Sequence, residues 1–420
     1  MIRLLLAFLA LLAMPLAARA QDAEVLRQRA EDVAAVIRGE KPYADVFAPV
    51  FVNAVPQGQF EALTGQLRDQ LGPFEGLAQI DAGEAPGAGT IGLRFRDAIA
   101  GGPIQLEGAA PWRVAGLRLN AIRPVAVEGQ TALDLVRDLP GTSSIYLARL
   151  DGSHTLIEHN ADRQMAIGST FKLYVLSALA QAVARGERRW DDVVPLTERS
   201  FPSGQMQDWP QGTPVTLQTL ATMMVAISDN TATDQLMHVL GRAAVEAEVG
   251  ASGHAQPEAT LPMMTTRELF LLKLGPEEQL VRYAGGDMAT RRAILAGLAG
   301  RELDMDQMQA VFADGPHHIG VEWFASGRDL AAIYRRMADD PVAAAILAVN
   351  PGMDRAQFGS WTSAGYKGGS EPGVLNFAWL LRDPAGAPWV LAMTWNDPAA
   401  NVSEARLIAL AQQVLAENAP

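Results

Sequence analysis

The 420-residue chain contains no cysteine, few lysines and, after its first twenty residues, no long apolar run. Without cysteine, the protein has no disulfides, no thiolate metal site, no cysteine nucleophile and no lipid-bearing N-terminal cysteine. The formal net charge of -13 argues against a nucleic-acid partner, because phosphate binding needs clustered lysine and arginine. The 34 basic residues include only four lysines, which are Lys41, Lys172, Lys273 and Lys367.

The first twenty residues have the pattern of a secretory signal peptide. An apolar stretch over 4–18 ends in Ala18-Arg19-Ala20, which indicates cleavage after Ala20. An uncleaved membrane anchor is the alternative, but about 15 apolar residues fall short of the roughly 20 that span a bilayer. We therefore expect a mature protein without a membrane span, in the periplasm or outside the cell.

Serine and histidine are both absent from residues 1–142 and recur regularly afterwards. This compositional shift predicts two separately evolved units. We expect a signal peptide at 1–20, a small α+β domain at 21–125, a linker at 126–140 and a second domain at 141–420.

In the first of these domains, apolar residues first recur at helical spacing and then alternate with other residues as in strands. Apolar residues at helical spacing predict a first helix, and a second helical stretch covers 60–71. Alternating runs that follow predict strands, with Ile91, Leu93 and Phe95 on one face, and Trp112, Val114, Leu117 and Leu119 on another. Helices followed by a curved antiparallel sheet resemble the cone-shaped fold of steroid isomerases and nuclear transport factors.

The second domain has strand patterns at both of its ends and helices between them. Asp151-Gly152 separates two short strand patterns and supplies the positive φ that a tight hairpin requires. A mainly helical stretch runs from about 170 to 340. Strands are predicted at 374–381 and 389–395, and a closing amphipathic helix at 403–416.

Ser169 and Lys172 open the first helix of this second domain. Residues three apart lie on one helix face, so the two side chains can meet. A desolvated lysine with a lowered pKa can take the proton of a serine hydroxyl and make it a nucleophile. Free backbone N–H groups at a helix N-terminus can stabilise an oxyanion. The alternative is a serine cap beside a surface lysine.

Two further polar clusters follow along the chain. Ser228-Asp229-Asn230 lies in a connection between two helical patterns, where small polar residues are ordinarily caps. Lys367-Gly368-Gly369-Ser370 leads into an apolar strand, and glycines beside a lysine allow a ligand to approach the backbone closely.

Together these three clusters resemble the motif set of the serine β-lactamase and penicillin-binding protein superfamily, in the same chain order. The resemblance covers roughly residues 140–418. Within the superfamily, this stretch is similar to class A β-lactamases. It implies an α+β fold with an antiparallel sheet flanked by helices and an all-helical subdomain. With the small domain in front, the whole chain is similar to the two-domain protein of the clavulanic acid biosynthesis cluster.

The resemblance also implies roles for the motif residues. Ser169 would attack a carbonyl, Lys172 would take its proton, and Ser228 would relay a proton to the leaving group. The resemblance further implies that Lys367 supports Ser228 electrostatically and helps to hold an anionic substrate, and that Asn230 contacts the substrate amide. Gly369 would allow the substrate to approach the strand closely. The N–H groups of Ser169 and Ser370 would form the oxyanion hole.

The sequence departs from the family pattern in the third motif. The middle position is Gly368, which lacks the usual hydroxyl, although Ser370 offers one nearby. Lys273-Leu274-Gly275 loosely fits the same pattern, but it ends a helical run, where lysine and glycine form an ordinary C-terminal cap.

A second departure concerns the carboxylate that activates the deacylating water in class A enzymes. The best match is Glu258, in Glu258-Ala259-Thr260-Leu261-Pro262, where proline replaces the family's asparagine. Glu258 is therefore either a displaced general base or a plain surface residue.

The sequence thus predicts an exported serine hydrolase that forms an acyl-enzyme from a β-lactam or a related amide or ester. An esterase or a slowly deacylating penicillin-binding-like protein is one alternative, and a non-catalytic envelope protein that binds a ligand is another. We expect a small-molecule substrate and no metal or other cofactor. The oligomeric state is left open.

Overall fold

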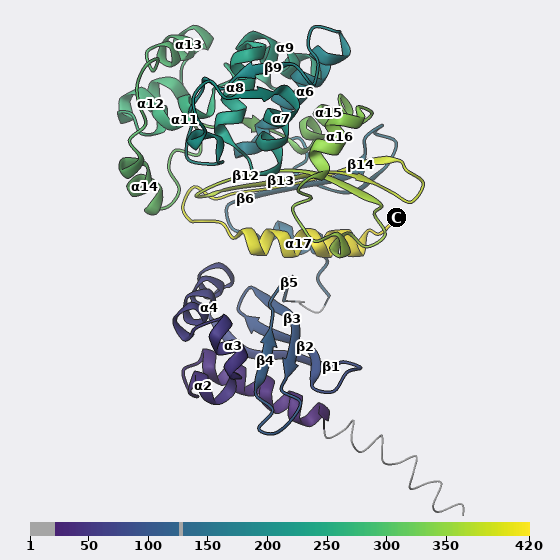
Figure 1. The fold of residues 1–420 in the computed structure, drawn as a ribbon. Helices are drawn as coiled ribbons and strands as arrows, with labels where there is room; N and C mark the ends of the chain where they lie inside the picture. The colour runs from purple at the N-terminus through teal and green to yellow at the C-terminus, as the bar shows by residue number, and fades with distance from the viewer. Residues whose placement is uncertain (1–21, 126–128) are drawn as a thin grey trace, which may run out of the picture. The chain divides into compact units, whose positions relative to one another are not determined.

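The computed structural model describes residues 22–125 and 129–420, so the expected signal peptide at 1–20 lies outside the described residues. The chain divides into two compact units (Figure 1). Unit 1 comprises Met1–Gly129 with Ser403–Gln413, and unit 2 comprises Gln130–Val402 with Val414–Pro420. The segment expected to be a linker is partly helical, because Thr131 and Asp134 form a capping box at the start of helix α5.

Unit 1 begins with helices whose apolar faces form its core. The first helix covers 22–37, and Leu26, Ala30, Val33 and Ile37, which set the helical spacing, are all buried. The following helices are α2 (Tyr43–Val46), α3 (Pro49–Ala54) and α4 (Gln57–Leu71). Four aromatic rings, those of Tyr43, Phe47, Phe51 and Phe60, pack with centroids 4.6 to 5.3 Å apart.

The sheet of unit 1 is antiparallel and has the order β1-β2-β3-β4, with β5 also paired to β3. Its strands are β1 (Phe74–Ala82), β2 (Ala88–Phe95), β3 (Ala98–Leu106), β4 (Val114–Leu117) and β5 (Ala121–Pro124). Ile91, Leu93 and Phe95 share the buried face of β2, as predicted. The expectation for Trp112 is wrong, because a φ of 53° breaks the extended backbone before β4 and leaves this residue 39% exposed.

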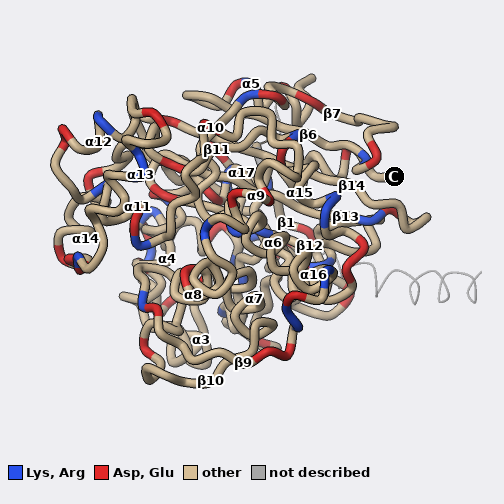
Figure 2. The backbone as a smooth tube through the Cα atoms, turned by 90° about the horizontal axis from the view of Figure 1, so that it is seen from above, with Lys and Arg blue, Asp and Glu red and all other residues tan. Residues whose placement is uncertain are grey.

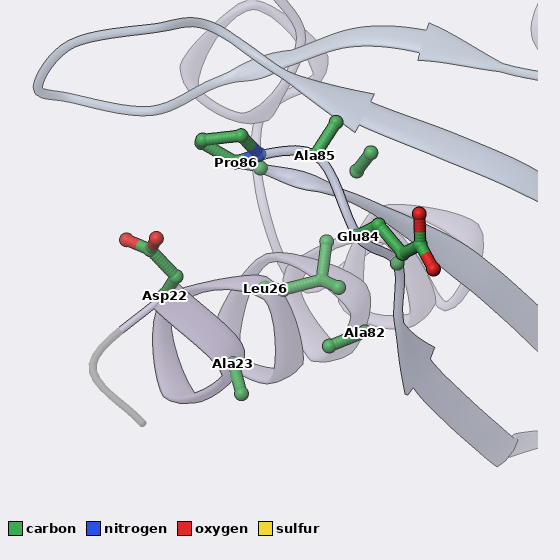
Figure 3. Close-up of a pocket in the computed structure, with 10 residues that line it drawn as sticks. Asp22, Ala23, Leu26, Ala82, Glu84, Ala85 and Pro86 are labelled. Carbon is green, nitrogen blue, oxygen red and sulfur yellow. The ribbon is translucent and has the colours of Figure 1, made fainter. Parts of the chain in front are cut away.

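A hollow in unit 1 lies between the start of the first helix and the turn that joins β1 to β2 (Figure 3). Asp22 and Glu84 supply the only charged groups among its lining residues, and the other lining residues are apolar. Such a lining offers two carboxylates and no histidine, lysine or hydroxyl group to work with them. We therefore assign no chemistry to this hollow.

Unit 2 is built around an antiparallel sheet of order β12-β13-β14-β6-β7. The first two strands along the chain join the last three, so both ends of this stretch of chain contribute to one sheet, as the sequence predicts. The turn Asp151-Gly152 has a φ of 75° at Gly152. The strands are β6 (Thr142–Arg149), β7 (Thr155–His159), β12 (Ser363–Glu371), β13 (Val374–Arg382) and β14 (Pro388–Asn396).

Helices fill the chain between β7 and β12, and α15 and α16 lie on one face of the sheet (Figure 1). Short strands β8 (Met165–Ala166) and β11 (Phe324–Ala325) pair with each other, as do β9 (Val193–Pro195) and β10 (Pro214–Thr216). These helices are α6 (Lys172–Ala184), α7 (Leu217–Ala226), α8 (Asn230–Leu240), α9 (Arg242–Ser252), α10 (Pro257–Thr260), α11 (Thr266–Lys273), α12 (Glu277–Ala284), α13 (Met288–Ala296), α14 (Met305–Ala313), α15 (Gly327–Arg335) and α16 (Pro341–Ala348), with 3₁₀ turns η1 (Gly168–Phe171), η2 (Met206–Asp208) and η3 (Arg355–Phe358). Helix α5 (Ala132–Arg137) precedes β6, and α17 (Glu404–Glu417) follows β14.

Helix α6 is the central element of the helical part. Its sequence is apolar on every side, and ten of its thirteen residues are buried. A helix without a polar face is stable in water only when other elements surround it. Lys172 is the only charged residue of this helix, and the fold therefore places a lysine in the interior of unit 2.

Positions of lysine and arginine are interspersed with positions of aspartate and glutamate along the backbone (Figure 2). Exposed arginines commonly lie beside carboxylates a few residues away, as in Arg27–Glu24 and Arg185–Glu187. None of the helices within 22–125 and 129–420 is long and apolar enough to cross a membrane.

Candidate active site

The three motifs meet at one place in unit 2, although up to 200 residues of sequence separate them. Ser169 lies in η1, immediately before Lys172 begins α6, and Ser228 and Asn230 lie at the junction of α7 and α8. Lys367 lies on β12, one of the two edge strands of the sheet. The fold thus brings together the hydroxyl, amide and amine groups of these segments.

The Lys172 ammonium is buried and is held by three oxygen atoms. Its Nζ donates to Ser228 O at 2.6 Å, to Asn230 Oδ1 at 2.7 Å and to Ser228 Oγ at 3.2 Å. None of these acceptors is charged. Burial lowers the pKa of Lys172 well below its usual value of 10.5, and the charge of Lys367 lowers it further. Lys172 can therefore lose its proton more easily than an exposed lysine.

Ser228 connects the two lysines of the site. Its Oγ accepts from Lys172 Nζ at 3.2 Å and from Lys367 Nζ at 3.1 Å. Its φ of 58° lies in the left-handed region, which costs a non-glycine residue free energy and persists only where the surroundings hold it. The hydrogen bond from Lys172 to the Ser228 carbonyl is one such restraint.

Asn230 and Asp229 attach a neighbouring loop to this turn. Asn230 Oδ1 accepts from Lys172, and its Nδ2 donates to Phe201 O at 3.0 Å. The Asp229 carboxylate caps α8 through Ala232 N and also accepts from Gln205 N and Met206 N. Both polar atoms of the Asn230 side chain thus have protein partners, and its contact with a substrate amide stays a prediction.

Lys367 is also buried, and burial lowers its pKa to about 7. Its Nζ donates to Gly368 O at 2.5 Å in addition to Ser228 Oγ. Lys367, rather than Lys273, is thus the strand lysine beside Ser228. Two amines with lowered pKa values therefore flank one hydroxyl group.

Strand β12 passes so close to η1 that only glycine fits at the contact. A Cβ on Gly369 would overlap the carbonyl oxygen of Ile167 and lie 2.6 Å from Ser169 N. A Cβ on Gly168 would lie 3.1 Å from Ser370 N. The backbone amides of Ser169 and Ser370, which follow Gly168 and Gly369 in sequence, therefore both lie at this contact between η1 and β12. Sequence reasoning identified Gly369 but missed Gly168, whose φ of 49° is the second reason for a glycine there.

Ser169 is half-buried at the N-terminal end of this arrangement. In the described part of the chain, no hydrogen bond joins its Oγ to Lys172 Nζ, whose acceptors are on Ser228 and Asn230. Phe171 stacks on Trp323 with centroids 3.7 Å apart, and Ile167 N donates to Trp323 O at 3.0 Å. These contacts hold the turn on both sides of Ser169.

Lys273 is not the capping lysine that the sequence predicts. Its Nζ is fully buried between Glu322, at 3.3 Å, and Glu371, which ends β12 next to Ser370. Burial alone lowers the pKa of Lys273, but the charges of Glu371 and Glu322 outweigh this effect and raise it. Burial and the charge of Glu322 raise the pKa of Glu371 to about 8. One cation thus serves two carboxyl groups, and Glu371 holds a proton more tightly than a free carboxyl group does.

Glu258 lies in the short helix α10, and its side chain is exposed. Its carbonyl oxygen accepts from Arg291 at 2.8 Å. No hydrogen bond joins its carboxylate to a motif residue within 22–125 and 129–420. Over the same residues, no group of three or more histidines and carboxylates could hold a metal ion.

Comparison with known families agrees with the motif reading. Residues 130–313 match the model of a family described as the beta-lactamase enzyme family. This segment contains the first two motifs, and the match confirms the resemblance of unit 2 to the serine β-lactamase-like superfamily. The match does not extend to unit 1. A comparison with curated proteins found no match.

Several solved structures are similar to the chain at low identity. The beta-lactamase from Sphaerobacter thermophilus DSM 20745 is 22% identical over 68% of this chain and 93% of its own, with a TM-score of 0.46. The putative class A beta-lactamase PenP from Rhodopseudomonas palustris is 16% identical over 68% and 95%, with a TM-score of 0.48. PBP-A is 19% identical over 68% and 94%, with a TM-score of 0.45. Likeness at this level carries no information on activity.

We predict that Gly369→Ala disrupts the contact between β12 and η1. The added methyl group meets backbone atoms, which cannot move aside as a flexible side chain can, so we expect a loss of about 1–3 kcal/mol in the free energy of unfolding. Denaturant titration measures this loss. Gly250→Ala is the control, because its Cβ would meet no atom within 4 Å and alanine favours helix α9. Equal stability of the two variants would contradict the assigned contact.

We also predict that Glu371 makes unit 2 less stable as pH rises. Its pKa is about 8 in the folded protein against 4.5 for the free group, so the folded state binds this proton more tightly. The resulting stabilisation is complete below pH 4.5 and is lost as pH rises through about 8, a total of about 5 kcal/mol at most.

Glu371→Gln removes this titration, so the wild type should lose stability relative to the variant as pH rises between 5 and 9. The matched control is Glu278→Gln, which removes an exposed carboxylate from α12 and should leave the wild-type slope. If Glu371→Gln keeps the wild-type slope, Glu371 is not the group that holds the proton.

Proposed function

We propose that unit 2 is a serine hydrolase that acts through an acyl-enzyme on Ser169, with a β-lactam or a related amide or ester as substrate. The observation that carries this proposal is the buried Lys172, which is held by neutral oxygen atoms and begins the helix that directly follows the 3₁₀ turn of Ser169. Its lowered pKa makes a neutral amine accessible, and a neutral amine can accept the hydroxyl proton.

In the proposed reaction, Ser169 Oγ attacks the substrate carbonyl carbon while its proton passes to Lys172 Nζ. The negative charge on the carbonyl oxygen is stabilised by the amide N–H groups of Ser169 and Ser370. The bond to the leaving nitrogen or oxygen then breaks, and that atom takes a proton from the Ser228 hydroxyl. Ser228 regains a proton from Lys172. Water finally hydrolyses the acyl-enzyme ester and restores Ser169.

The close approach of β12 to η1 supports the oxyanion hole in this scheme. Gly369 lets the two segments lie so close together that Ser169 N adjoins the residue that precedes Ser370. Ser169 and Lys172 are not hydrogen-bonded to each other in the free protein, and catalytic hydrogen bonds often tighten only when substrate is bound.

Slow deacylation is the second candidate, and the exposure of Glu258 favours it. A base that activates the hydrolytic water must lie within hydrogen-bonding reach of the acyl group. The carboxylate of Glu258 has no hydrogen bond to the motif residues among the described part of the chain. In that case the protein forms an acyl-enzyme with a β-lactam and releases it slowly, as penicillin-binding proteins do.

We also propose that the protein acts in the periplasm or outside the cell. This proposal rests on the apolar stretch and Ala-x-Ala pattern of residues 1–20, which are outside the described structure. The absence of cysteine excludes a lipid-modified cysteine as its anchor.

We predict that Lys172→Arg lowers the rate of acylation by about 100-fold or more, because arginine stays protonated and cannot accept the Ser169 proton. Intact-mass spectrometry with penicillins, cephalosporins and activated esters measures the rate. In the wild type, the rate should rise with pH through the lowered pKa of Lys172 and level off below 10.5.

The matched control is Lys41→Arg, which makes the same substitution at a lysine of unit 1 and should leave the acylation rate unchanged. Ser169→Ala should abolish the adduct. A wild-type protein that forms no adduct and turns over none of these compounds contradicts the proposed function.

We expect Glu258→Gln to leave the deacylation rate within about twofold of the wild type, because its carboxylate is exposed and makes no hydrogen bond to a motif residue among the described residues. The time course of adduct loss after removal of free ligand gives this rate. A fall of about 100-fold would identify Glu258 as the general base instead.

A further inference from the structure

The third buried lysine of unit 2 has no part in the proposed reaction. Lys273 ends α11, and its Nζ lies 3.3 Å from Glu322 Oε1 and also donates to Glu371 Oε1. The side chains of Lys273 and Glu322 are at most 1% exposed, and that of Glu371 is 8% exposed. Buried ion clusters of this kind are often no more stabilising than apolar side chains of similar size. The place of the cluster in the fold is therefore the better guide to its role.

Glu371 places one arm of the cluster beside the proposed oxyanion hole. It is the last residue of β12 and directly follows Ser370, whose N–H is one of the two proposed donors. Strand β12 is an edge strand that pairs with β13 on one side and approaches η1. Gly369, at that approach, has no side chain that could fix the distance between the two segments. The hydrogen bond from Lys273 to Glu371 ties this end of the strand to α11.

Glu322 connects the same cluster to the turn that carries Ser169. It directly precedes Trp323, whose ring stacks on Phe171 with centroids 3.7 Å apart. The carbonyl oxygen of Trp323 accepts from Ile167 N at 3.0 Å. Ile167 and Phe171 lie two residues before and two residues after Ser169. One ammonium group thus links the end of β12 to the segment that holds the Ser169 turn on both sides.

The two proposed donors belong to separate segments, since Ser169 lies in η1 and Ser370 on β12. Oxyanion-hole donors act only when they are aimed at one oxygen atom, so a small change in their separation weakens the hole. We propose that Lys273, with Glu322 and Glu371, is a positioning group that holds these donors at the separation that a tetrahedral oxyanion requires. The three side chains act through the backbone and not through contact with the substrate. This inference rests on the proposed function and adds residues outside its three motifs.

In this role, position 371 has to supply an oxygen acceptor but no second negative charge. Lys273 already has Glu322 as a counter-ion, and burial and the charge of Glu322 raise the pKa of Glu371 to about 8. A glutamine oxygen can accept from an ammonium group as the oxygen of a protonated carboxyl group does. Glu371→Gln should therefore preserve the link, and Glu371→Met should break it.

The test measures acylation of Ser169 by benzylpenicillin and by p-nitrophenyl acetate in variants at position 371. Glu371→Met keeps an unbranched side chain of similar length, removes the acceptor oxygen and leaves Lys273 paired with Glu322. We expect its second-order acylation constant to fall by about tenfold or more with both compounds, because both reactions form an oxyanion. Glu371→Gln should stay within about threefold of the wild type.

The infrared spectrum of the acyl-enzyme separates this role from a general loss of stability. Hydrogen bonds from an oxyanion hole polarise the ester carbonyl of the adduct and lower its stretching frequency. In Glu371→Met the carbonyl band of the benzylpenicillin adduct should therefore move to higher frequency, and in Glu371→Gln it should stay. Lys273→Met breaks the same link from α11 and should give the same shift, so the test does not depend on the folding of one variant.

Glu248→Met is the matched control. Glu248 is another buried carboxylate, but its partners are Ser177 and Arg336 rather than the segments that carry the two donors. The variant leaves Arg336 without this partner, so it should lower the free energy of unfolding. The acylation constants and the carbonyl band should stay at their wild-type values.

Three results overturn the positioning role and leave the proposed function intact. They are a wild-type acylation constant in Glu371→Met, a loss of rate without a shift of the carbonyl band, and an equal loss in Glu371→Gln. A wild-type protein that forms no Ser169 adduct with either compound overturns the proposed function, and the positioning role with it.

Discussion

The candidate site depends on the burial of one amine without a carboxylate partner. Lys172 and Lys273 are both fully buried, yet their pKa values move in opposite directions. Lys273 lies between two carboxyl groups, whose negative charge outweighs the cost of burial. Lys172 has neutral oxygen partners instead, and Lys367 adds a like charge nearby. The same residue type is therefore a permanent cation at one position and a potential base at the other.

The surrounding fold maintains this difference. Helix α6 keeps water from Lys172 because apolar elements surround it on all sides. The turn at Ser228 supplies a carbonyl and a hydroxyl oxygen, and Asp229 fixes that turn to the loop at Gln205 and Met206. The ion cluster around Lys273 lies at the end of β12 and holds the strand that carries Lys367. The buried charges that stabilise the unit are thus separate from the amines proposed to act.

The predictable part of the fold is the part that local patterns specify. Periodicity identified the first helix and the buried face of β2, and the turn residues Asp151-Gly152 identified a hairpin, because each depends on neighbours within a few residues. Trp112 shows where this reasoning stops. Its spacing from Val114 fits a strand, but its backbone has positive φ and its side chain is exposed. Nothing in the spacing of apolar residues reports a local backbone conformation of that kind.

By itself, the sequence determined the chemical inventory of the site, which is serine, lysine, serine, asparagine and lysine in a specific order and with very few lysines elsewhere. It could not tell a capping lysine from a buried one at Lys273, because the carboxylates that surround it come from positions 49 and 98 residues away. The sequence could not show that Tyr366 Oη lies over Gly368, because this approach depends on the packing of β12 against its neighbours. Charge and pKa depend on distance in space and on access of water, and these are decided only when the chain folds.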